Sequence, residues 1–316
     1  MRYRQLGRSG LTVSVVGLGA NNFGARLDQA ATATVVDAAL DVGINLIDTA
    51  DVYGGRGGSE EVLGRVLKGR RDEVVLATKF GSDMGGTNGP DWGARASRRY
   101  IRRAVEASLR RLETDWIDLY QLHRPDGVTP IEETLEALGE LVAEGKIRYA
   151  GSSNFAGWQI AAAHYLAQTP GRATFVSAQN HYSLLARDIE EEVIPAAIKY
   201  GVGILPFFPL ANGLLTGKWR RGEPPPAGSR LAEDWTRKGI GERDFDVVEG
   251  LAAFAAAREV RLLDVAIGGL AALPGVASVI AGATSAEQVR ANAAAGEWVP
   301  ETAELAEIDR ITAREG

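Results

Sequence analysis

The chain of 316 residues contains no cysteine. This absence excludes disulfide bonds, thiolate metal sites and cysteine nucleophiles, and it removes thiol content as a guide to the redox compartment. The rest of the composition is ordinary for a globular protein, with 45% hydrophobic and 24% charged residues. A chain of this length and composition can bury a sizeable core.

The chain also lacks an excess of basic residues and any long apolar run. Acidic residues outnumber basic ones by 41 to 35, which gives a net charge of -6 and a pI near 5.3. A general nucleic-acid binder needs basic surface to displace counterions, so we expect no nucleic-acid partner. No stretch approaches the roughly 20 apolar residues of a membrane span, and the opening MRYRQLGRSG lacks the apolar region of a secretion signal. We expect no membrane partner and a cytoplasmic location.

A regular alternation of strand-like and helix-like segments runs along the whole chain. A β-hairpin is predicted over residues 1–14, around the turn GRSG. Eight strands are predicted at 15–19, 45–51, 74–80, 117–123, 147–152, 175–181, 203–209 and 277–281. Helices are predicted at 30–42, 98–112, 131–145, 156–168, 189–200, 245–260 and 301–313, with two more that begin at Ser59 and Ser285. Eight such units favour an α/β fold of the (β/α)8 TIM barrel type, with residues 1–316 as one domain.

Two of the predicted connections are much longer than a simple link requires. They span residues 81–97 and 211–243, and both are rich in glycine, proline and charged residues. Both leave the carboxyl end of a strand, where the long loops of a barrel usually carry binding function. The alternative is that they are flexible surface insertions.

The glycines after the first barrel strand resemble the start of a dinucleotide fingerprint. Gly17, Gly19 and Gly24 are present, but the fingerprint needs its third glycine at the position of Asn22. We interpret these glycines as a means of tight barrel packing and an open strand exit.

Polar side chains able to do chemistry stand where four predicted strands end. Asp48 and Tyr53 follow one strand, Lys79 lies near the end of the next, and His123 ends the third. Gln179 and Asn180 lie near the end of a fourth. A free tyrosine has a pKa of about 10, and a neighbouring ammonium group lowers it. Asp48 can supply the counter-charge of Lys79, and His123 can orient a carbonyl group.

This set suits the reduction of a carbonyl group if a hydride source lies opposite. A lone lysine–aspartate pair is more often a buried ion pair than a catalytic one, but four such groups at four strand ends favour catalysis. The alternative chemistry is a Schiff-base lyase or aldolase that uses Lys79 as its nucleophile. Asp48 would keep that lysine charged, which disfavours the alternative.

The motifs that contain these residues resemble those of the aldo-keto reductases, especially the bacterial branch. Asp48, Thr49, Ala50 and Tyr53 match the family's DTA…Y motif, Lys79 lies in ATK, and residues 122–125 read LHRP. The segments IDLYQLH, GKIRYAGSSNF and EEVIP are similarly close. The resemblance implies that Tyr53 is the general acid, that Lys79 and Asp48 tune its pKa, and that His123 orients the carbonyl. It also implies a small carbonyl substrate and a nicotinamide cofactor bound across the barrel mouth, with no Rossmann domain and no metal.

The same resemblance implies a set of cofactor-binding positions. Ser153, Asn154 and Gln179 would hold the nicotinamide carboxamide, since they carry hydroxyl and amide groups. Phe207 would stack on the nicotinamide ring. The remaining positions are Gly19 and Ala20 after the first strand, Pro209, Leu210, Gly213 and Lys218 in a pyrophosphate loop, Arg230 beyond it, and Gly282, Thr284, Gln288 and Asn292 around the adenosine. The helix that begins at Ser285 would offer free N–H groups to anions.

The chain departs from the family pattern at the adenosine end. Many members have a lysine and an arginine that bind the 2′-phosphate of NADPH, where this chain has Gly282 and Gln288. The preference for NADPH over NADH would then depend on Thr284, Lys218, Arg230 and Arg290. We expect NADPH, and NADH stays open.

The sequence does not identify the substrate, because loops vary freely on a constant barrel. The positions expected around the substrate are Asn21, Asn22 and Phe23, the 81–97 loop with Met84 and Trp92, Arg124, Tyr182 and the 211–243 loop. Arg124 stands where some members have an aromatic residue and would make the pocket more polar. The oligomeric state is not readable from the sequence.

A second alternative is a regulatory subunit that has the same fold but does not turn over a substrate rapidly. The segments RQLGRSGL and GLG are also similar to potassium-channel β subunits, which retain the same four polar residues. No segment precedes the hairpin in this sequence, which disfavours that alternative.

Overall fold

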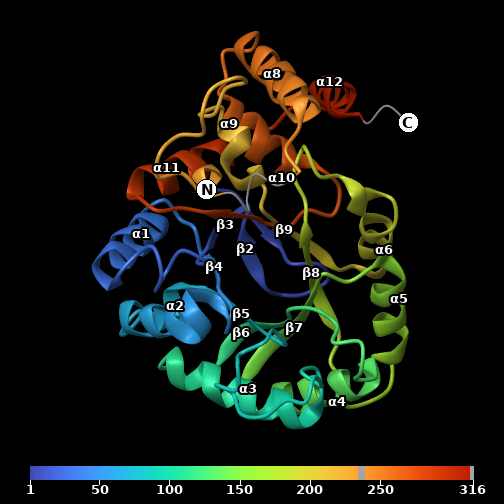
Figure 1. Cartoon of the computed structure of the whole chain (residues 1–316). Coiled ribbons are helices and arrows are strands. Elements are labelled where there is room, and N and C mark those ends of the chain that lie inside the picture. The colour runs from blue at the N-terminus through green and yellow to red at the C-terminus, as the bar shows by residue number, and fades with distance from the viewer. Residues whose placement is uncertain (234–238, 314–316) are drawn as a thin grey trace.

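The computed structural model describes residues 1–233 and 239–313, and it forms a parallel barrel surrounded by helices (Figure 1). The sheet has the strand order β10-β3-β4-β5-β6-β7-β8-β9, and every neighbouring pair is parallel. Ile204 of β9 accepts a hydrogen bond from the N–H of Ala277, just before β10, which brings the two sheet edges together. The predicted (β/α)8 TIM barrel is confirmed.

The observed elements follow the predicted ones closely. The barrel strands are β3 (Val16–Gly19), β4 (Leu46–Asp48), β5 (Val75–Phe80), β6 (Ile117–Leu122), β7 (Ile147–Ser153), β8 (Phe175–His181), β9 (Gly203–Phe207) and β10 (Val279–Gly282). The outer helices are α1 (Gln29–Asp41), α2 (Tyr53–Val66), α3 (Arg98–Arg111), α4 (Ile131–Ala143), α5 (Gly157–Leu166), α6 (Val193–Tyr200), α8 (Glu242–Ala256), α11 (Ala286–Ala295) and α12 (Thr302–Thr312).

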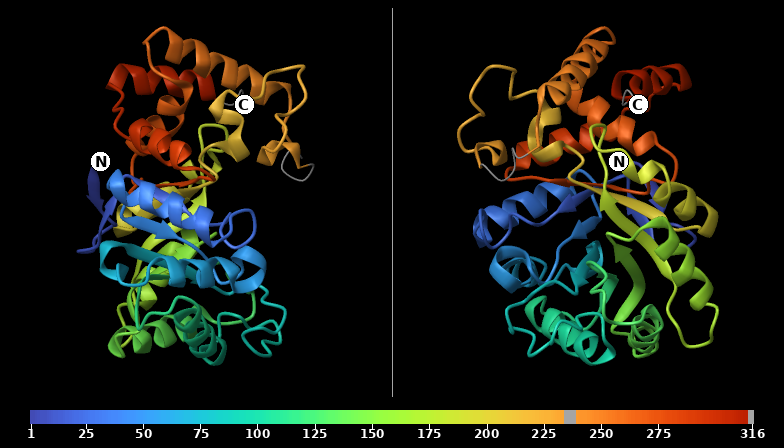
Figure 2. Two further views of the ribbon diagram at one scale, coloured as in Figure 1. Left: turned by 90° about the vertical axis from the view of Figure 1, so that its left-hand side faces the viewer. Right: turned by 45° about the vertical axis from the view of Figure 1, so that its right-hand side comes forward.

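The predicted hairpin consists of β1 (Tyr3–Gln5) and β2 (Thr12–Ser14), which pair antiparallel. Leu6 and Val13 are fully buried against the barrel interior, in one cluster with Leu46 and Leu119. The hairpin therefore closes the amino-terminal end of the barrel. The two long loops leave the opposite end, as the side view in Figure 2 shows.

The 81–97 loop is described throughout, whereas the 211–243 loop is described in part. The first part of the 211–243 loop forms a 3-10 helix at Ala211–Thr216, and a second short 3-10 helix follows at Arg230–Ala232. Residues 234–238 of the predicted loop lie outside the described residues. Both loops remain candidates for binding function, since they border the open end of the barrel.

One helical segment was missed in the sequence. It runs from α9 (Leu262–Asp264) through a π-helical turn at Val265–Gly269 to α10 (Leu270–Ala272). Most of its residues are buried, so it lacks the polar face that gives a surface helix its recognisable period. A Cβ atom at Gly268 would lie 2.6 Å from the carbonyl oxygen of Trp298, which explains why this helix carries glycine.

The start of α2 also differs from the prediction that Ser59 caps this helix. A first turn begins at Tyr53, residues 54–57 form a kink with positive, non-helical φ angles, and the regular helix follows this kink. The Ser59 hydroxyl instead donates to the carbonyl oxygen of Ala20 at 2.9 Å and bonds to the Thr49 hydroxyl at 2.7 Å. Ser59 thus ties the turn that carries Tyr53 to the ends of β3 and β4.

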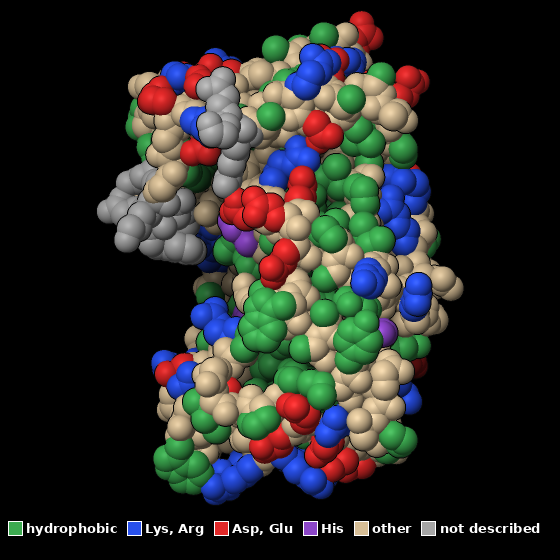
Figure 3. All heavy atoms as spheres, turned by 90° about the vertical axis from the view of Figure 1, so that its right-hand side faces the viewer, with side chains coloured by type: hydrophobic (Ala, Val, Ile, Leu, Met, Phe, Trp, Pro, Cys, Tyr) green, Lys and Arg blue, Asp and Glu red, His purple; other side chains and the backbone are tan. Residues whose placement is uncertain are grey.

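Within residues 1–233 and 239–313, no helix combines the length and apolarity that a bilayer span requires. Hydrophobic side chains do reach the surface over α5 and α6, where Figure 3 shows them among polar and charged groups. Trp158 and Tyr165 of α5 and Ile198 of α6 are exposed.

Candidate active site

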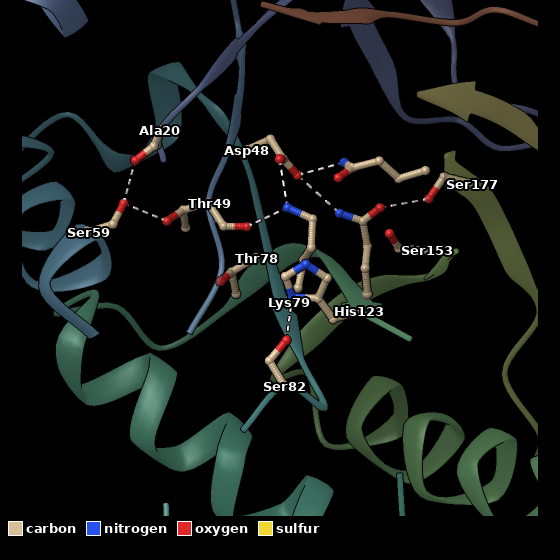
Figure 4. A network of polar contacts seen from close by, with 12 residues as sticks. Ala20, Asp48, Thr49, Ser59, Thr78, Lys79, Ser82, His123, Ser153 and Ser177 are labelled. Carbon is tan, nitrogen blue, oxygen red and sulfur yellow. Dashed lines mark hydrogen bonds and ion pairs between the residues drawn. The ribbon is translucent and has the colours of Figure 1, made fainter. Parts of the chain in front are cut away.

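Asp48 and Lys79 form a buried ion pair at the carboxyl ends of β4 and β5 (Figure 4). The Lys79 ammonium group donates to Asp48 Oδ2 at 2.7 Å and to the carbonyl oxygen of Thr49 at 2.8 Å. The side chain of Lys79 is 0% exposed and that of Asp48 is 4% exposed. Buried charges are tolerated only when they are paired and hydrogen-bonded, and this pair meets both conditions.

The second carboxylate oxygen of Asp48 also accepts hydrogen bonds. Asp48 Oδ1 accepts hydrogen bonds from the side-chain amides of Gln121 at 3.2 Å and Gln179 at 2.9 Å. The strand register brings these groups together, because Lys79 pairs with Gln121 and Ser153 pairs with Gln179 across neighbouring strands. Four barrel strands thus contribute to one polar cluster.

Tyr53 lies directly beside this cluster, at the first position of α2. The Lys79 ammonium nitrogen is 5.0 Å from the centre of the Tyr53 ring. The ring is partly exposed to the barrel mouth, and it meets His123 edge-on at 5.9 Å between ring centres. The four predicted catalytic residues are therefore neighbours in space.

The pKa of Tyr53 differs from the expectation. Burial raises the pKa of the Tyr53 phenol and outweighs the Lys79 charge, which acts to lower it. The phenol pKa is raised from its ordinary value, so the expected net lowering is not found. For Lys79, burial acts to lower the amine pKa, but Asp48 and Tyr53 together overcome it, and the net pKa is raised. At neutral pH the phenol is protonated and the lysine is charged.

His123 is neutral in this surrounding. Burial lowers the pKa of its imidazole to about 3, and the charges of Lys79 and Arg124 act in the same direction. Its Nδ1 atom lies 3.0 Å from the hydroxyl of Ser82. The side-chain amide of Asn154, a residue with a left-handed φ of 58°, donates to the backbone oxygen of His123 at 2.9 Å.

Ser82 was not anticipated in the sequence. It lies two residues beyond β5, at the start of the 81–97 loop. A hydroxyl residue immediately after a strand that carries Lys79 was a usable signal, but the loop length hid which of its polar residues turn toward the barrel.

Two cavities open at the barrel mouth and share Tyr53, Gln179, Phe207 and Phe208 in their walls. The first has a volume of about 740 Å³ and extends from Asp48 to α11. The second, of about 500 Å³, is bounded by Tyr53, His123, Arg124 and the start of the 81–97 loop. Tyr53 thus faces a long groove on one side and a smaller cavity on the other.

Most of the expected cofactor-binding residues line the long groove. The groove is lined by Gly19, Ala20, Gln179, Phe207, Pro209, Leu210, Gly213, Lys218, Arg230, Gly282, Thr284, Gln288 and Asn292. Ser153 and Asn154 line the smaller cavity instead. The Ser285 hydroxyl caps α11 by accepting from the N–H of Gln288, and Gln288 Oε1 accepts from the N–H of Thr284 at 2.8 Å.

Two cationic residues line the same groove without having been expected there. Arg26 belongs to the segment after β3 and forms an ion pair with Glu233 of the long loop. Arg261 directly precedes α9, and its guanidinium group binds Asp264. Both come from parts of the chain with no recognisable motif, so only the folded chain brings them to the groove. Arg290, which was expected near the adenosine, does not line it.

Of the residues expected around the substrate, Arg124 lines the smaller cavity and Asn22 lines the groove. Asn21 lines the groove as well, whereas neither cavity is lined by Phe23, Met84, Trp92 or Tyr182. Phe23 is fully buried, and the buried Tyr182 donates its hydroxyl to Glu190 at 2.6 Å. Trp92 is 72% exposed and packs against Arg99, whose guanidinium carbon lies 4.5 Å from a Trp92 ring centre. In the described part of the chain, no group of three or more acidic or histidine side chains forms a candidate metal site.

The model of the Aldo/keto reductase family matches residues 15–313. The chain belongs to the aldo/keto reductase family. This reductase is similar to an uncharacterised oxidoreductase, YrpG, of Bacillus subtilis. The two sequences are 43% identical over 240 residues, and the aligned part covers 74% of this chain and 73% of the relative. It is also 39% identical to the versiconal hemiacetal acetate reductase of Aspergillus parasiticus, over 69% of this chain and 70% of that one.

A third relative is described differently. A probable voltage-gated potassium channel subunit beta of Oryza sativa is 36% identical over 95% of this aldo/keto reductase and 92% of its own length. The predicted resemblance to both groups is thus confirmed. The family comprises NAD(P)H-dependent oxidoreductases that act on small carbonyl compounds, and this chain is an oxidoreductase of that family.

Proposed function

We propose that this oxidoreductase reduces an aldehyde or ketone with NADPH, and that Tyr53 protonates the carbonyl oxygen. The observation that carries the proposal is the position of Tyr53. Its ring lies 5.0 Å from the Lys79 ammonium nitrogen, beside a neutral His123, and it borders both cavities. A protonated phenol, a fixed positive charge and an open cavity are what carbonyl protonation requires.

The long groove suits a nicotinamide dinucleotide. Its side-chain amides complement the carboxamide of the nicotinamide, while Lys218 and Arg230 can meet the phosphates. Phe207 offers an aromatic wall for the nicotinamide ring. When bound, the reduced nicotinamide supplies the hydride that goes to the carbonyl carbon. Ser153 and Asn154 border the smaller cavity, and we propose that they reach the carboxamide from that side.

The proton step follows from the charges around Tyr53. The phenol is protonated at neutral pH, since the ordinary pKa of a tyrosine is about 10 and burial raises it further. As negative charge develops on the substrate oxygen, the phenol donates its proton and becomes a phenolate. The Lys79 ammonium group stabilises that phenolate, and Asp48 keeps Lys79 charged and in place. The phenolate then regains a proton from solvent.

His123 acts as a neutral hydrogen-bond donor in this proposal. Since its pKa lies at about 3, it carries no charge at physiological pH. If the Ser82 hydroxyl donates to Nδ1, the ring hydrogen resides on Nε2. That tautomer lets His123 donate to the substrate oxygen and hold it near Tyr53.

The preference for NADPH over NADH belongs to the same proposal. Gly282 and Gln288 offer no cation to a 2′-phosphate, but Arg261 lines the same groove, together with Thr284. Asp264 accepts from Nε and Nη2 of Arg261 and leaves Nη1 without a hydrogen bond in the described part of the chain. We propose that Arg261 provides the positive charge that the last strand and helix lack.

The test is a steady-state screen of aldehydes and ketones with NADPH and with NADH. We expect several aldehydes to be reduced, with NADPH preferred. Tight binding of NADPH without turnover of any carbonyl compound would favour a regulatory role instead. Borohydride trapping of an adduct at Lys79 would indicate Schiff-base chemistry and contradict the proposal.

A further inference from the structure

The smaller cavity has a polar side whose charges are not fully balanced. Its walls include Tyr53 and His123, together with three charged residues, Asp83, Arg95 and Arg124. Phe207 and Phe208 add an aromatic wall. A carbonyl compound that approaches Tyr53 from this cavity therefore brings the rest of its structure past two arginines and one acid.

Arg95 is already committed to neighbouring acids. Its Nε donates to Asp91 Oδ2 at 2.8 Å, and its Nη2 lies 3.2 Å from Asp83 Oδ2. In the described part of the chain, Asp83 is the one acidic residue that lines this cavity, and it is paired with Arg95. Within the cavity wall the charges of Asp83 and Arg95 cancel, while Asp91, which does not line the cavity, adds one negative charge beside Arg95.

Arg124 is different. Within residues 1–233 and 239–313 it makes no hydrogen bond or ion pair. The nearest acid along the chain is Asp126, but its carboxylate accepts from three backbone N–H groups, of Ala96, Val128 and Thr129, and from the Thr129 hydroxyl. Arg124 thus keeps a full positive charge at the cavity wall.

The positive charge of Arg124 acts on His123, one of the predicted catalytic residues in the cavity wall. It directly follows His123 in the chain, and it contributes to keeping the imidazole neutral. The amide of Asn154 holds the backbone oxygen of His123 at 2.9 Å, so the point from which Arg124 leaves the strand is fixed. An anion placed beside Arg124 would lie in the same 500 Å³ space as a carbonyl group at Tyr53.

We propose that the preferred substrates are aldehydes or ketones that carry a carboxylate, and that Arg124 binds this carboxylate. The inference rests on the proposed carbonyl reduction and adds the substrate class to it. The planar guanidinium group matches a carboxylate with two parallel hydrogen bonds, which lysine cannot provide. Because Arg124 is exposed to solvent, we expect a moderate preference of about tenfold rather than an absolute one.

The test compares 4-carboxybenzaldehyde with its methyl ester, which has nearly the same shape and no charge. We expect the ratio of kcat/KM for the acid to that for the ester to be about ten or more in the wild type. In Arg124→Gln the ratio should fall to near one, chiefly through KM for the acid, and Arg124→Lys should restore it in part. The matched control is Arg65→Gln, an exposed arginine outside both cavities, which should keep the wild-type ratio.

A binding measurement separates this inference from the proposed reaction. Titration with 4-(hydroxymethyl)benzoate and its methyl ester needs no turnover, and we expect the acid to bind about tenfold more tightly unless Arg124 is replaced. Turnover of the ester alone, or equal ratios in wild type and Arg124→Gln, would overturn the role of Arg124 while leaving carbonyl reduction intact. Absence of any turnover with a retained binding preference would overturn the reaction and support the anion site.

Discussion

The Lys79 ammonium group donates to the Asp48 carboxylate at 2.7 Å, in a place where both side chains are shielded from water. The orientation of the Asp48 carboxylate toward Lys79 is fixed, because Gln121 and Gln179 donate hydrogen bonds to its other oxygen. The positive end of the pair points toward Tyr53, and the proposed proton transfer depends on that orientation.

Replacing Lys79 by methionine should destabilise the protein strongly. The substitution leaves Asp48 buried without its counter-charge, and breaking a buried pair in this way costs about 3 to 5 kcal/mol. Urea denaturation followed by circular dichroism would measure the loss. The double variant Lys79→Met with Asp48→Asn removes both charges and should recover much of it. A loss below about 1 kcal/mol in the single variant would show that the pair is not buried as described.

Replacing Tyr53 by phenylalanine should remove the proton donor while it preserves the aromatic ring. We expect kcat to fall roughly 100- to 10,000-fold. The dissociation constant for NADPH, measured by fluorescence quenching, should change little. Tyr149→Phe is the matched control, since Tyr149 packs near the hairpin and borders neither cavity. An equal loss of cofactor affinity in Tyr53→Phe would assign this residue to binding rather than to proton transfer.

His123 should make stability depend on pH below neutrality. Its pKa is about 3 in the folded protein and about 6.5 in an unfolded chain. The unfolded chain therefore binds the extra proton between these values, and the stability contributed by the neutral imidazole is lost as the pH falls from about 6.5 toward 3. Urea midpoints across this range should decline less steeply in His123→Gln than in the wild type. An identical slope in both proteins would mean that His123 titrates normally.

The substitution Arg261→Gln should weaken the binding of NADPH and leave the binding of NADH unchanged. The 2′-phosphate is the one group that distinguishes the two cofactors, so we expect the dissociation constant for NADPH to rise about tenfold. Lys218→Gln is the useful comparison, because loss of a cation near the pyrophosphate should weaken both cofactors. Equal weakening of NADPH and NADH in Arg261→Gln would place Arg261 elsewhere along the cofactor.

Gly139→Ala should destabilise the protein although alanine favours helices. A Cβ atom at Gly139 of α4 would lie 1.9 Å from the carbonyl oxygen of Gly171, and a backbone atom cannot move away cheaply. We expect a net loss of about 1 to 3 kcal/mol. The control is Gly250→Ala in α8, where the new atom would meet only the Ile311 side chain at 2.9 Å. Similar thermal midpoints for the two variants would argue against this close approach.

The sequence predicted the barrel and the catalytic neighbours because both follow from local patterns. Four of the predicted strands carry a polar residue at or near their ends, and parallel strands of a barrel bring their carboxyl ends to one mouth, which explains Asp48, Lys79 and His123. Arg261 and Ser82 were missed because their positions, in the groove wall and beside His123, depend on how distant segments meet. The direction of the Tyr53 pKa was missed because the desolvation of this side chain, which depends on its folded surroundings, outweighs a neighbouring charge.

The buried helix from α9 to α10 escaped prediction for a related reason. With Val265, Ala266, Ile267 and Leu270 all covered, it shows no alternation of apolar and polar faces. Phe23 and Tyr182 were placed near the substrate on the basis of their position after a strand. Their side chains instead turn into the protein, a direction that sequence position alone does not give.

The central claim, hydride transfer from a nicotinamide to a carbonyl carbon, is tested most directly with NADPH labelled with deuterium on either face of C4. The enzyme, an aldehyde and each labelled cofactor are incubated together, and the alcohol is analysed by mass spectrometry and NMR. We expect one of the two cofactors to give an alcohol with one deuterium at the former carbonyl carbon. An unlabelled alcohol from both cofactors, or no alcohol despite bound NADPH, would contradict carbonyl reduction by this protein.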